Sequence, residues 1–364
     1  MVLYLLVTAL TILLSTLTRV RVKAGSRQQA INVCALMAIF LVLFFVSALR
    51  VRTGNDYWWY TNIMHEASVG GHVPTEAGFN LIVRAVYTVF GYENYLFVFA
   101  LMSFATVTLF LFSIWRMTED FAMSFAMFLL LGYYLQSFST VRYYAVLPCA
   151  LLALYYCDRG DWPRFVLIVL CAALVHKSIL VILVFYPLCR MRWRVWMAAL
   201  MGAVSAAVFL LPAQVMRLAL LVYPTYANAT DRGDSGFSLF NVARCVLVIG
   251  FVWWNTRGYL YLTEEDSVEL RRMRTWSKMT VMALCVYIGG ARLPQISRIA
   301  YYLTLPQILL LPSVCMRIPE RETRRLMRGI VLVACVLVFM RYLLHAADDG
   351  IRVLPYRTFL FYEG

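Results

Sequence analysis

Charged residues are scarce in this chain of 364 residues: Asp, Glu, Lys and Arg make up 14% of it, whereas a soluble globular protein carries about a quarter. Hydrophobic residues make up 62%. They come in runs long enough to cross about 30 Å of hydrocarbon as a helix, and the runs lack the alternation of a barrel strand. Because lipid satisfies no backbone amide, such runs have to be helical. The composition excludes a soluble domain and predicts an all-α polytopic membrane protein.

Patterns for disulfides, metals and nucleic acid are also missing. The nine cysteines contain no CxxC pair, so neither a disulfide framework nor a zinc site is expected. No DxD spacing occurs, and the pairs Asp348–Asp349 and Asp231–Asp234 are weak candidates for a metal, so we expect no obligatory metal or cofactor. The net charge of +14 could indicate nucleic acid, but basic loops that hold the cytoplasmic side of a membrane protein explain it better.

The apolar runs and the positive-inside rule predict a topology in which both chain ends lie outside. With a short hairpin added, the chain has about ten to twelve membrane segments. The predicted spans cover 1–18, 29–49, 95–115, 119–136, 140–157, 195–212, 238–256, 276–291, 297–316 and 328–346.

The segment 163–189 decides this topology. As one crossing it would reverse the sidedness of every later basic loop and would put His176, with the lysine and serine that follow it, deep in lipid. We therefore predict two short legs, 163–175 and 178–189, that turn at His176. Each leg is only about 20 Å long, so the tip of this hairpin is expected in a thinned or water-filled region.

Three longer stretches fall on the outer face in this topology: the loops 50–94 and 212–237 and the tail 346–364. Within the first, residues 79–91 have the pattern of an interfacial amphipathic helix. No internal repeat is visible, and the whole chain, 1–364, is predicted to be a single transmembrane domain.

Several cations lie in or at the edge of the predicted spans, and Glu119 and Asp120, at the start of 119–136, are the only acidic residues inside any predicted span. A cation in a membrane is costly and usually finds a partner, so one explanation is that a phosphate or diphosphate ligand supplies the anion. The alternative is that each side chain reaches the interface or bonds to backbone carbonyls. These residues are Arg142, His176, Lys177, Arg244, Arg292, Arg298 and Arg341.

Tyrosines accompany two of these arginines. Tyr301 and Tyr302 follow Arg298 at helical spacing and so share its face, and Tyr143 follows Arg142 directly. Rings that stack on sugars beside guanidinium groups that pair with phosphate suit a sugar–phosphate ligand. The alternative is an interfacial aromatic belt.

Carboxylates for general base catalysis come from the first outer loop. Asp56 and Glu76 could each take a proton from a sugar hydroxyl, although a solvated loop carboxylate is the alternative for both. At the predicted hairpin tip, His176 could be a base, a phosphate ligand or a helix cap.

The same loop resembles the EpsG family of Wzy-type polysaccharide and O-antigen polymerases. The family pattern is an Arg, then Gly-x-Asp-Tyr-x-x-Tyr, then Glu-x-Gly-Phe before an amphipathic helix. It is matched here by Arg52, Gly54, Asp56, Tyr57, Tyr60, Glu76, Gly78 and Phe79.

Weaker elements follow in the family's order over most of the chain. Arg142 matches an Arg-Gln element in which Tyr143 replaces the glutamine. A His-x-Ser element is matched by His176 and Ser178, and a late Arg-x-x-x-Tyr element by Arg298 and Tyr302. Near the C-terminus, VLPYRTFLF resembles the family's end.

The resemblance implies a metal-independent glycosyltransferase of the multi-span GT-C-like type in the bacterial inner membrane, with its site facing the periplasm. Its substrate would be an undecaprenyl-diphosphate-linked oligosaccharide, and a chain-length regulator is a possible partner. Asp56, Glu76 or His176 would act on the acceptor hydroxyl. The diphosphate would meet Arg142 and Arg298, supported by Arg292 and Arg52, and sugars would meet Tyr57, Tyr60, Tyr143, Tyr301 and Tyr302.

Three other functions fit a membrane protein that collects cations. A flippase or transporter of lipid-linked sugars would bind the same headgroup, but it should carry inverted repeats. A ligase of lipid-linked glycans or a single-sugar transferase would use the same carrier lipid. A multi-span acyltransferase that modifies surface glycans is the third.

Overall fold

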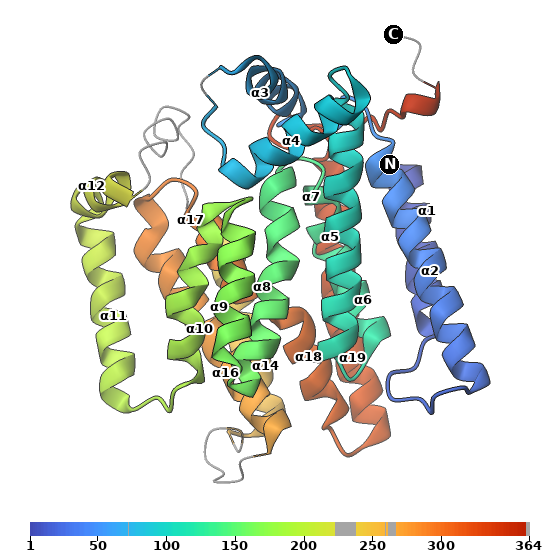
Figure 1. Ribbon diagram of the computed structural model, residues 1–364. Helices are drawn as coiled ribbons and strands as arrows, with labels where there is room; N and C mark the ends of the chain where they lie inside the picture. Colours follow the sequence, from blue (N-terminus) through green and yellow to red (C-terminus); the bar gives the residue numbers. More distant parts are fainter. Residues whose placement is uncertain (72, 223–237, 259, 261–266, 362–364) are drawn as a thin grey trace. The chain divides into compact units, whose positions relative to one another are not determined.

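The computed structural model describes residues 1–71, 73–222, 238–258, 260 and 267–361. The regular secondary structure of these residues is helical (Figure 1). Their one β pairing is an isolated bridge between Arg50 and Thr358. The all-α prediction is confirmed. The aspartates proposed as a weak metal site, Asp231–Asp234, lie outside the described residues, as does most of the predicted outer loop 212–237.

The chain folds into two compact units, each of which we describe by itself. Unit 1 comprises Met1–Leu152, Leu170–Lys177 and Cys315–Gly364, and unit 2 comprises Ala153–Val169 and Ser178–Val314. Two helices, α8 (Val141–Arg159) and α9 (Trp162–Ala173), contribute residues to both units.

In unit 1, α6 forms the centre of the helical packing. It contacts α1, α5 and α19, and nine of its ten residues are buried. A second packed group joins α3 to α4 and α4 to the beginning of α5. The bounds are α1 (Val2–Thr16), α2 (Arg27–Ala48), α3 (Tyr57–Val69), α4 (Ala77–Phe90), α5 (Tyr95–Met117), α6 (Phe121–Leu130), α7 (Tyr133–Gln136), α19 (Arg321–Leu344) and η4 (Phe359–Phe361).

In unit 2, α16 has the central position and contacts α10, α11, α14 and α17. The bounds are η1 (Lys177–Val181, whose first residue belongs to unit 1), α10 (Ile182–Arg190), α11 (Val195–Leu210), α12 (Pro212–Val222), α14 (Leu239–Thr256), α16 (Val268–Gly289), η3 (Gly290–Arg292), α17 (Ile296–Thr304) and α18 (Gln307–Met316, which ends in unit 1).

Polar side chains mark where several helices begin, as their local chemistry requires. Ser26, Asn94, Asp120, Ser238 and Ser267 each accept a hydrogen bond from the backbone N–H three residues further along. The helix α16 begins after the cap at Ser267, well before the predicted span 276–291. The basic stretch 271–274, which was expected in a loop, is therefore helical.

Five of the described helices are long and apolar enough to cross a membrane, or six if the bent pair Ala199–Leu210 and Pro212–Leu218, which meet at 95°, counts as one crossing. The five are Arg27–Ala48, Tyr95–Met117, Leu239–Thr256, Ile296–Met316 and Arg321–Leu344. On α2, large apolar side chains at a spacing of four residues, such as Met37, Leu41 and Phe45, are exposed. A stripe of this kind is expected where a helix faces lipid.

The predicted hairpin has its break where the sequence placed it. The helix α9 ends at Ala173, and a new helical segment begins at Lys177. The legs run side by side at the ends away from the break, because the Arg190 guanidinium lies over the Trp162 ring at 5.2 Å and the rings of Phe165 and Tyr186 stack at 6.3 Å.

Candidate functional site

Glu76 brings three separate segments of unit 1 together. It is the residue before α4 and its side chain points inward, with 3% of it exposed. Its carboxylate pairs with the Arg142 guanidinium and accepts a hydrogen bond from the backbone N–H of Lys177 at 3.1 Å. The same carboxylate lies 4.0 Å from Nδ1 of His176. We name Glu76, Arg142 and His176 the acid–base cluster of unit 1.

Arg142 is surrounded by aromatic rings as well as by this carboxylate. Its guanidinium carbon lies 5.5 Å from the Trp59 ring, 5.8 Å from Tyr60 and 5.4 Å from Phe79. Its backbone N–H donates to the Tyr60 hydroxyl at 3.3 Å. The prediction that cations in the membrane region lack an acidic partner in the chain is therefore wrong for Arg142. Glu76 supplies that partner, because the start of α4 folds into the unit instead of remaining in a solvated loop.

His176 occupies the helix break, where its backbone N–H still donates to Ala172 at 3.1 Å. The imidazole is buried, and the Tyr143 ring meets it edge to face with centroids 5.6 Å apart. The ring thus packs against Tyr143 and lies near the Glu76 carboxylate, so the tip of the predicted hairpin is part of the acid–base cluster.

The Glu-x-Gly-Phe element holds this arrangement through all three of its fixed residues. Gly78 donates its backbone N–H to the Leu174 carbonyl at 2.8 Å, and a Cβ at Gly78 would lie 2.6 Å from that oxygen. Phe79 is fully buried beside Tyr60 and Arg142. A glycine is required here because two backbones approach closely.

In the Gly-x-Asp-Tyr element, a glycine is required at Gly54 for a similar reason. Its φ of +102° favours glycine, and an added Cβ would collide with the Phe138 carbonyl. Its N–H donates to the Arg352 carbonyl at 2.8 Å. The loop that carries Asp56 is thus anchored to the end of the chain.

The C-terminal segment 346–361 crosses this loop, and we call it the C-terminal strap. Its hydrogen bonds join Val51 N to Arg357 O at 2.9 Å, Phe359 N to Leu49 O at 2.8 Å and the Tyr356 hydroxyl to Val46 O at 3.0 Å. The strap also contains the weak metal candidate Asp348–Asp349. Its second residue, Asp349, is exposed and pairs with Arg352 at 2.8 Å.

Arg50 lies beneath the strap with 1% of it exposed. Its guanidinium donates to the Ser47 carbonyl and, at 3.2 Å, to the Ser103 hydroxyl. It also lies over the rings of Phe99 and Phe138, at 5.2 and 4.9 Å. Burial lowers the pKa of Arg50 to about 10, so it stays charged at neutral pH. Burying a charge among neutral groups costs free energy. The two hydrogen bonds of Arg50 connect the end of α2 to α5.

The remaining candidates of the first loop lie at the start of α3. Asp56 is half-buried at the residue before the helix, and the exposed Arg52 stacks on the Trp58 ring at 5.0 Å. Tyr57 stacks on Phe99, and both Tyr57 and Tyr60 are buried. Protein atoms therefore cover these two of the five tyrosines that were predicted to bind sugar. The exposed aromatic residues of α3 are Trp58 and Trp59, which the sequence argument missed although they stand together inside the motif.

The candidates of unit 2 form a different set of contacts. The Tyr302 hydroxyl is 2.8 Å from the Ser178 hydroxyl, and the Tyr302 carbonyl accepts from Tyr186 at 3.1 Å. Arg298 and Tyr301 are half-buried on α17. The His-x-Ser element thus contributes His176 to the cluster of unit 1 and Ser178 to a hydroxyl pair in unit 2.

Two further arginines of unit 2 contact neutral groups. The Arg292 guanidinium lies over the Phe209 ring at 4.5 Å. Arg244 donates to the Gln307 side chain at 2.7 Å and to the Thr304 carbonyl at 3.4 Å. For Arg244, bonds to an amide and a carbonyl agree with the alternative reading of the intramembrane cations.

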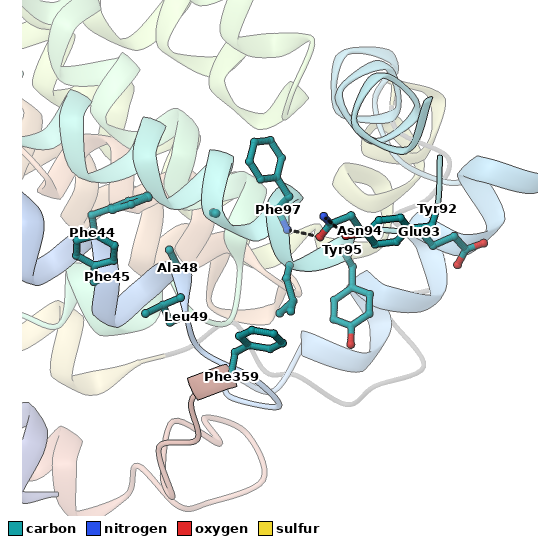
Figure 2. A pocket seen from close by; sticks show the side chains of 12 residues that line it. Phe44, Phe45, Ala48, Leu49, Tyr92, Glu93, Asn94, Tyr95, Phe97 and Phe359 are labelled. Atoms are coloured by element: carbon teal, nitrogen blue, oxygen red, sulfur yellow. Dashed lines mark hydrogen bonds between the residues drawn. The ribbon is translucent and has the colours of Figure 1, made fainter. Parts of the chain in front are cut away.

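Unit 1 also contains an apolar groove of about 550 Å³ between the end of α2 and the beginning of α5 (Figure 2). Glu93 is the one charged residue in the described lining, and its carboxylate lies 2.8 Å from Nδ1 of His65. No Lys or Arg is among the described residues that line it, so the groove suits hydrocarbon and not a diphosphate. Its lining comprises Phe44, Phe45, Ala48, Leu49, Tyr92, Glu93, Asn94, Tyr95, Leu96, Phe97, Ala100 and Phe359.

The sequence model of the EpsG family matches residues 33–358, nearly the whole chain. Neither the comparison with curated proteins nor the comparison with solved structures gives a match.

Proposed function

Because this chain belongs to the EpsG family, a family of Wzy-like polysaccharide polymerases, we propose that it transfers a growing glycan from a lipid diphosphate to an incoming lipid-linked repeat unit. The observation that carries the proposal is the acid–base cluster: Glu76, Arg142 and His176 come from three distant segments and meet in unit 1. The proposed site lies at the extracytoplasmic face of the bacterial inner membrane, and the carrier is undecaprenyl diphosphate.

The proposed reaction forms one bond and breaks one. The acceptor sugar's hydroxyl oxygen bonds to the anomeric carbon of the donor, while the bond from that carbon to the phosphate oxygen breaks. The electron pair leaves with the lipid diphosphate, and the hydroxyl proton passes to a general base.

Asp56 is the residue that we propose as this base. Glu76 is engaged by a guanidinium and a backbone N–H, so it serves as a positioning residue for Arg142 and for the His176 segment. Asp56 is half-buried at the start of α3, and a proton acceptor has to reach the substrate.

Arginines are the proposed ligands of the diphosphate, because fixed guanidinium groups stabilise the charge that develops on a leaving phosphate. In unit 1 these are Arg52, which is exposed beside Trp58, and Arg142, which Glu76 holds in place. In unit 2, Arg298 and Arg292 stay candidates from the sequence pattern, and each is considered within its own unit. Since Glu76 offsets part of the charge of Arg142, we expect Arg142 to contribute orientation more than net attraction.

The test is reconstitution of the purified protein in lipid vesicles with a synthetic repeat unit on a lipid diphosphate. A ladder of polymer lengths supports polymerisation. Transfer of single intact units across the bilayer without a ladder would instead establish a flippase.

Variants in the same vesicles test the roles. Loss of a general base costs about 10²- to 10⁴-fold in rate, so Asp56→Asn should lower kcat by at least about 100-fold. Arg298→Lys should also lower it, because lysine lacks the bidentate fork. Arg164→Ala is the control, since Arg164 is an exposed residue that pairs with Asp161 on the surface of unit 2. Full activity in Asp56→Asn would remove Asp56 from the mechanism.

A further inference from the structure

The four aromatic residues at the start of α3 fall into two pairs that lie on opposite sides of the helix. Tyr57 and Tyr60, three residues apart and hence on one face, are 3% and 2% exposed, whereas Trp58 and Trp59 are 52% and 36% exposed. One face of α3 therefore belongs to the core of unit 1, and the other presents two indole rings to the surroundings.

Trp59 differs from an ordinary exposed tryptophan because it lies against the acid–base cluster. Three rings approach the Arg142 guanidinium within 6 Å. Tyr60 and Phe79 are buried, and Trp59 is the one of the three that is exposed. A molecule that approaches Arg142 from this side meets Trp59 first.

The neighbouring ring repeats the arrangement. Trp58 carries the guanidinium of Arg52 at 5.0 Å, so each of the two indoles is paired with an arginine. Pairing with a guanidinium restrains a ring and lowers the entropy that it loses when a ligand stacks on it. Asp56, with acceptor oxygens for sugar hydroxyls, begins the same helix.

We propose that Trp59, with Trp58 and Arg52 beside it, forms a stacking platform for a pyranose ring of the lipid-linked oligosaccharide. This inference rests on the proposed function and names the residues that bind the sugar. The apolar face of a pyranose covers the indole, while its hydroxyls remain available to Arg52 and Asp56. The platform takes the place of Tyr57 and Tyr60, whose rings are covered by protein.

A membrane-interface role is the competing explanation for any exposed tryptophan. Trp254 serves as the matched control. It is 78% exposed near the C-terminal end of α14, a candidate span of unit 2. Substitution of a tryptophan that only meets the interface should have the same effect at both positions.

The experiment compares Trp59→Ala, Trp59→Phe and Trp254→Ala by two measurements. The first is the KM for the synthetic lipid-linked repeat unit in vesicles. The second is binding of the water-soluble oligosaccharide, cut from its lipid, to the purified protein by saturation-transfer NMR. Stacking on an aromatic ring is worth about 0.5–1.5 kcal/mol, and about 1.4 kcal/mol is a factor of ten, so Trp59→Ala should weaken both by about two- to twelvefold. Trp59→Phe should recover most of the loss, and Trp254→Ala should match the wild type.

The two proposals can fail separately. If the wild type forms a ladder and Trp59→Ala changes neither the KM nor the oligosaccharide binding, the platform is refuted while the polymerase stands. If the wild type binds the oligosaccharide through Trp59 but forms no ladder, the platform stands and the polymerase is refuted. Absence of both in the wild type overturns both. If the alanine variant does not fold, Trp59→Leu replaces it, because leucine keeps an apolar side chain but has no ring on which a sugar can stack.

Discussion

The backbone N–H of Gly78 donates a hydrogen bond of 2.8 Å to the carbonyl oxygen of Leu174. Through this contact the start of α4 lies directly against the end of α9, two residues before His176. The loop 50–94 and the helix break at His176, which are distant in the sequence, are therefore in contact within unit 1.

Gly78→Ala should separate these two backbones. A Cβ would lie 2.6 Å from the Leu174 oxygen, so the contact has to open and His176 has to move with it. We expect at least a tenfold loss of polymer formation, since displacements of about 1 Å are costly to catalysis. Gly329→Ala on α19 is the control: its Cβ meets nothing within 4 Å, and helix propensity predicts a gain of up to about 1 kcal/mol. Equal activity in both variants would contradict the assigned role of Gly78.

A double-mutant cycle on Glu76 and Arg142 should show strong coupling. Removing one partner of a buried ion pair leaves an uncompensated charge and costs about 3–5 kcal/mol. Glu76→Gln and Arg142→Met should each lower the thermal midpoint markedly, and the double variant should recover part of the loss. The exposed pair Arg164–Asp161 is the comparison, with an expected coupling of about 0–1 kcal/mol. Additive effects at Glu76 and Arg142 would show that the pair is not formed.

Removal of the C-terminal strap should loosen the loop that carries Asp56. The N–H groups of Val51 and Gly54 donate to strap carbonyls, so they are protected from hydrogen exchange by the strap. In a chain that ends after His345, we expect exchange of amides 51–54 to rise at least about tenfold, measured by mass spectrometry. Amides in the middle of α6 should keep their rates, which separates a local effect from unfolding. Unchanged exchange at 51–54 would mean that the strap does not hold the loop.

The hydroxyl pair of unit 2 makes a separate prediction. Ser178 and Tyr302 are joined by one hydrogen bond of 2.8 Å, which is worth about 0.5–1.5 kcal/mol. Ser178→Ala and Tyr302→Phe should each lower the unfolding free energy by about that amount, and the double variant should lose little more than either one. Full additivity in denaturant titrations would refute a direct bond.

Local patterns of the sequence were enough for the class and for several boundaries. Apolar runs too long for a soluble core predicted helices in a membrane, and the polar triplet from His176 to Ser178 predicted the break between α9 and α10, because such residues are costly in the middle of a span. The amphipathic pattern of 79–91 predicted α4, which runs from Ala77 to Phe90. These features depend on neighbours along the chain.

The partner of each polar group depended on the tertiary structure. Arg142 and Glu76 are 66 residues apart, and nothing in either local pattern indicates that the start of α4 turns inward. Similarly, the local pattern of residues 57–60 does not reveal which aromatic residues of α3 face the core; the rings of Phe79 and Phe99 and the Arg142 guanidinium decide it. Amino-acid order determines helix and span through short-range hydrogen bonding and hydrophobicity, whereas the pairing of buried charges requires the distant segments to have packed together.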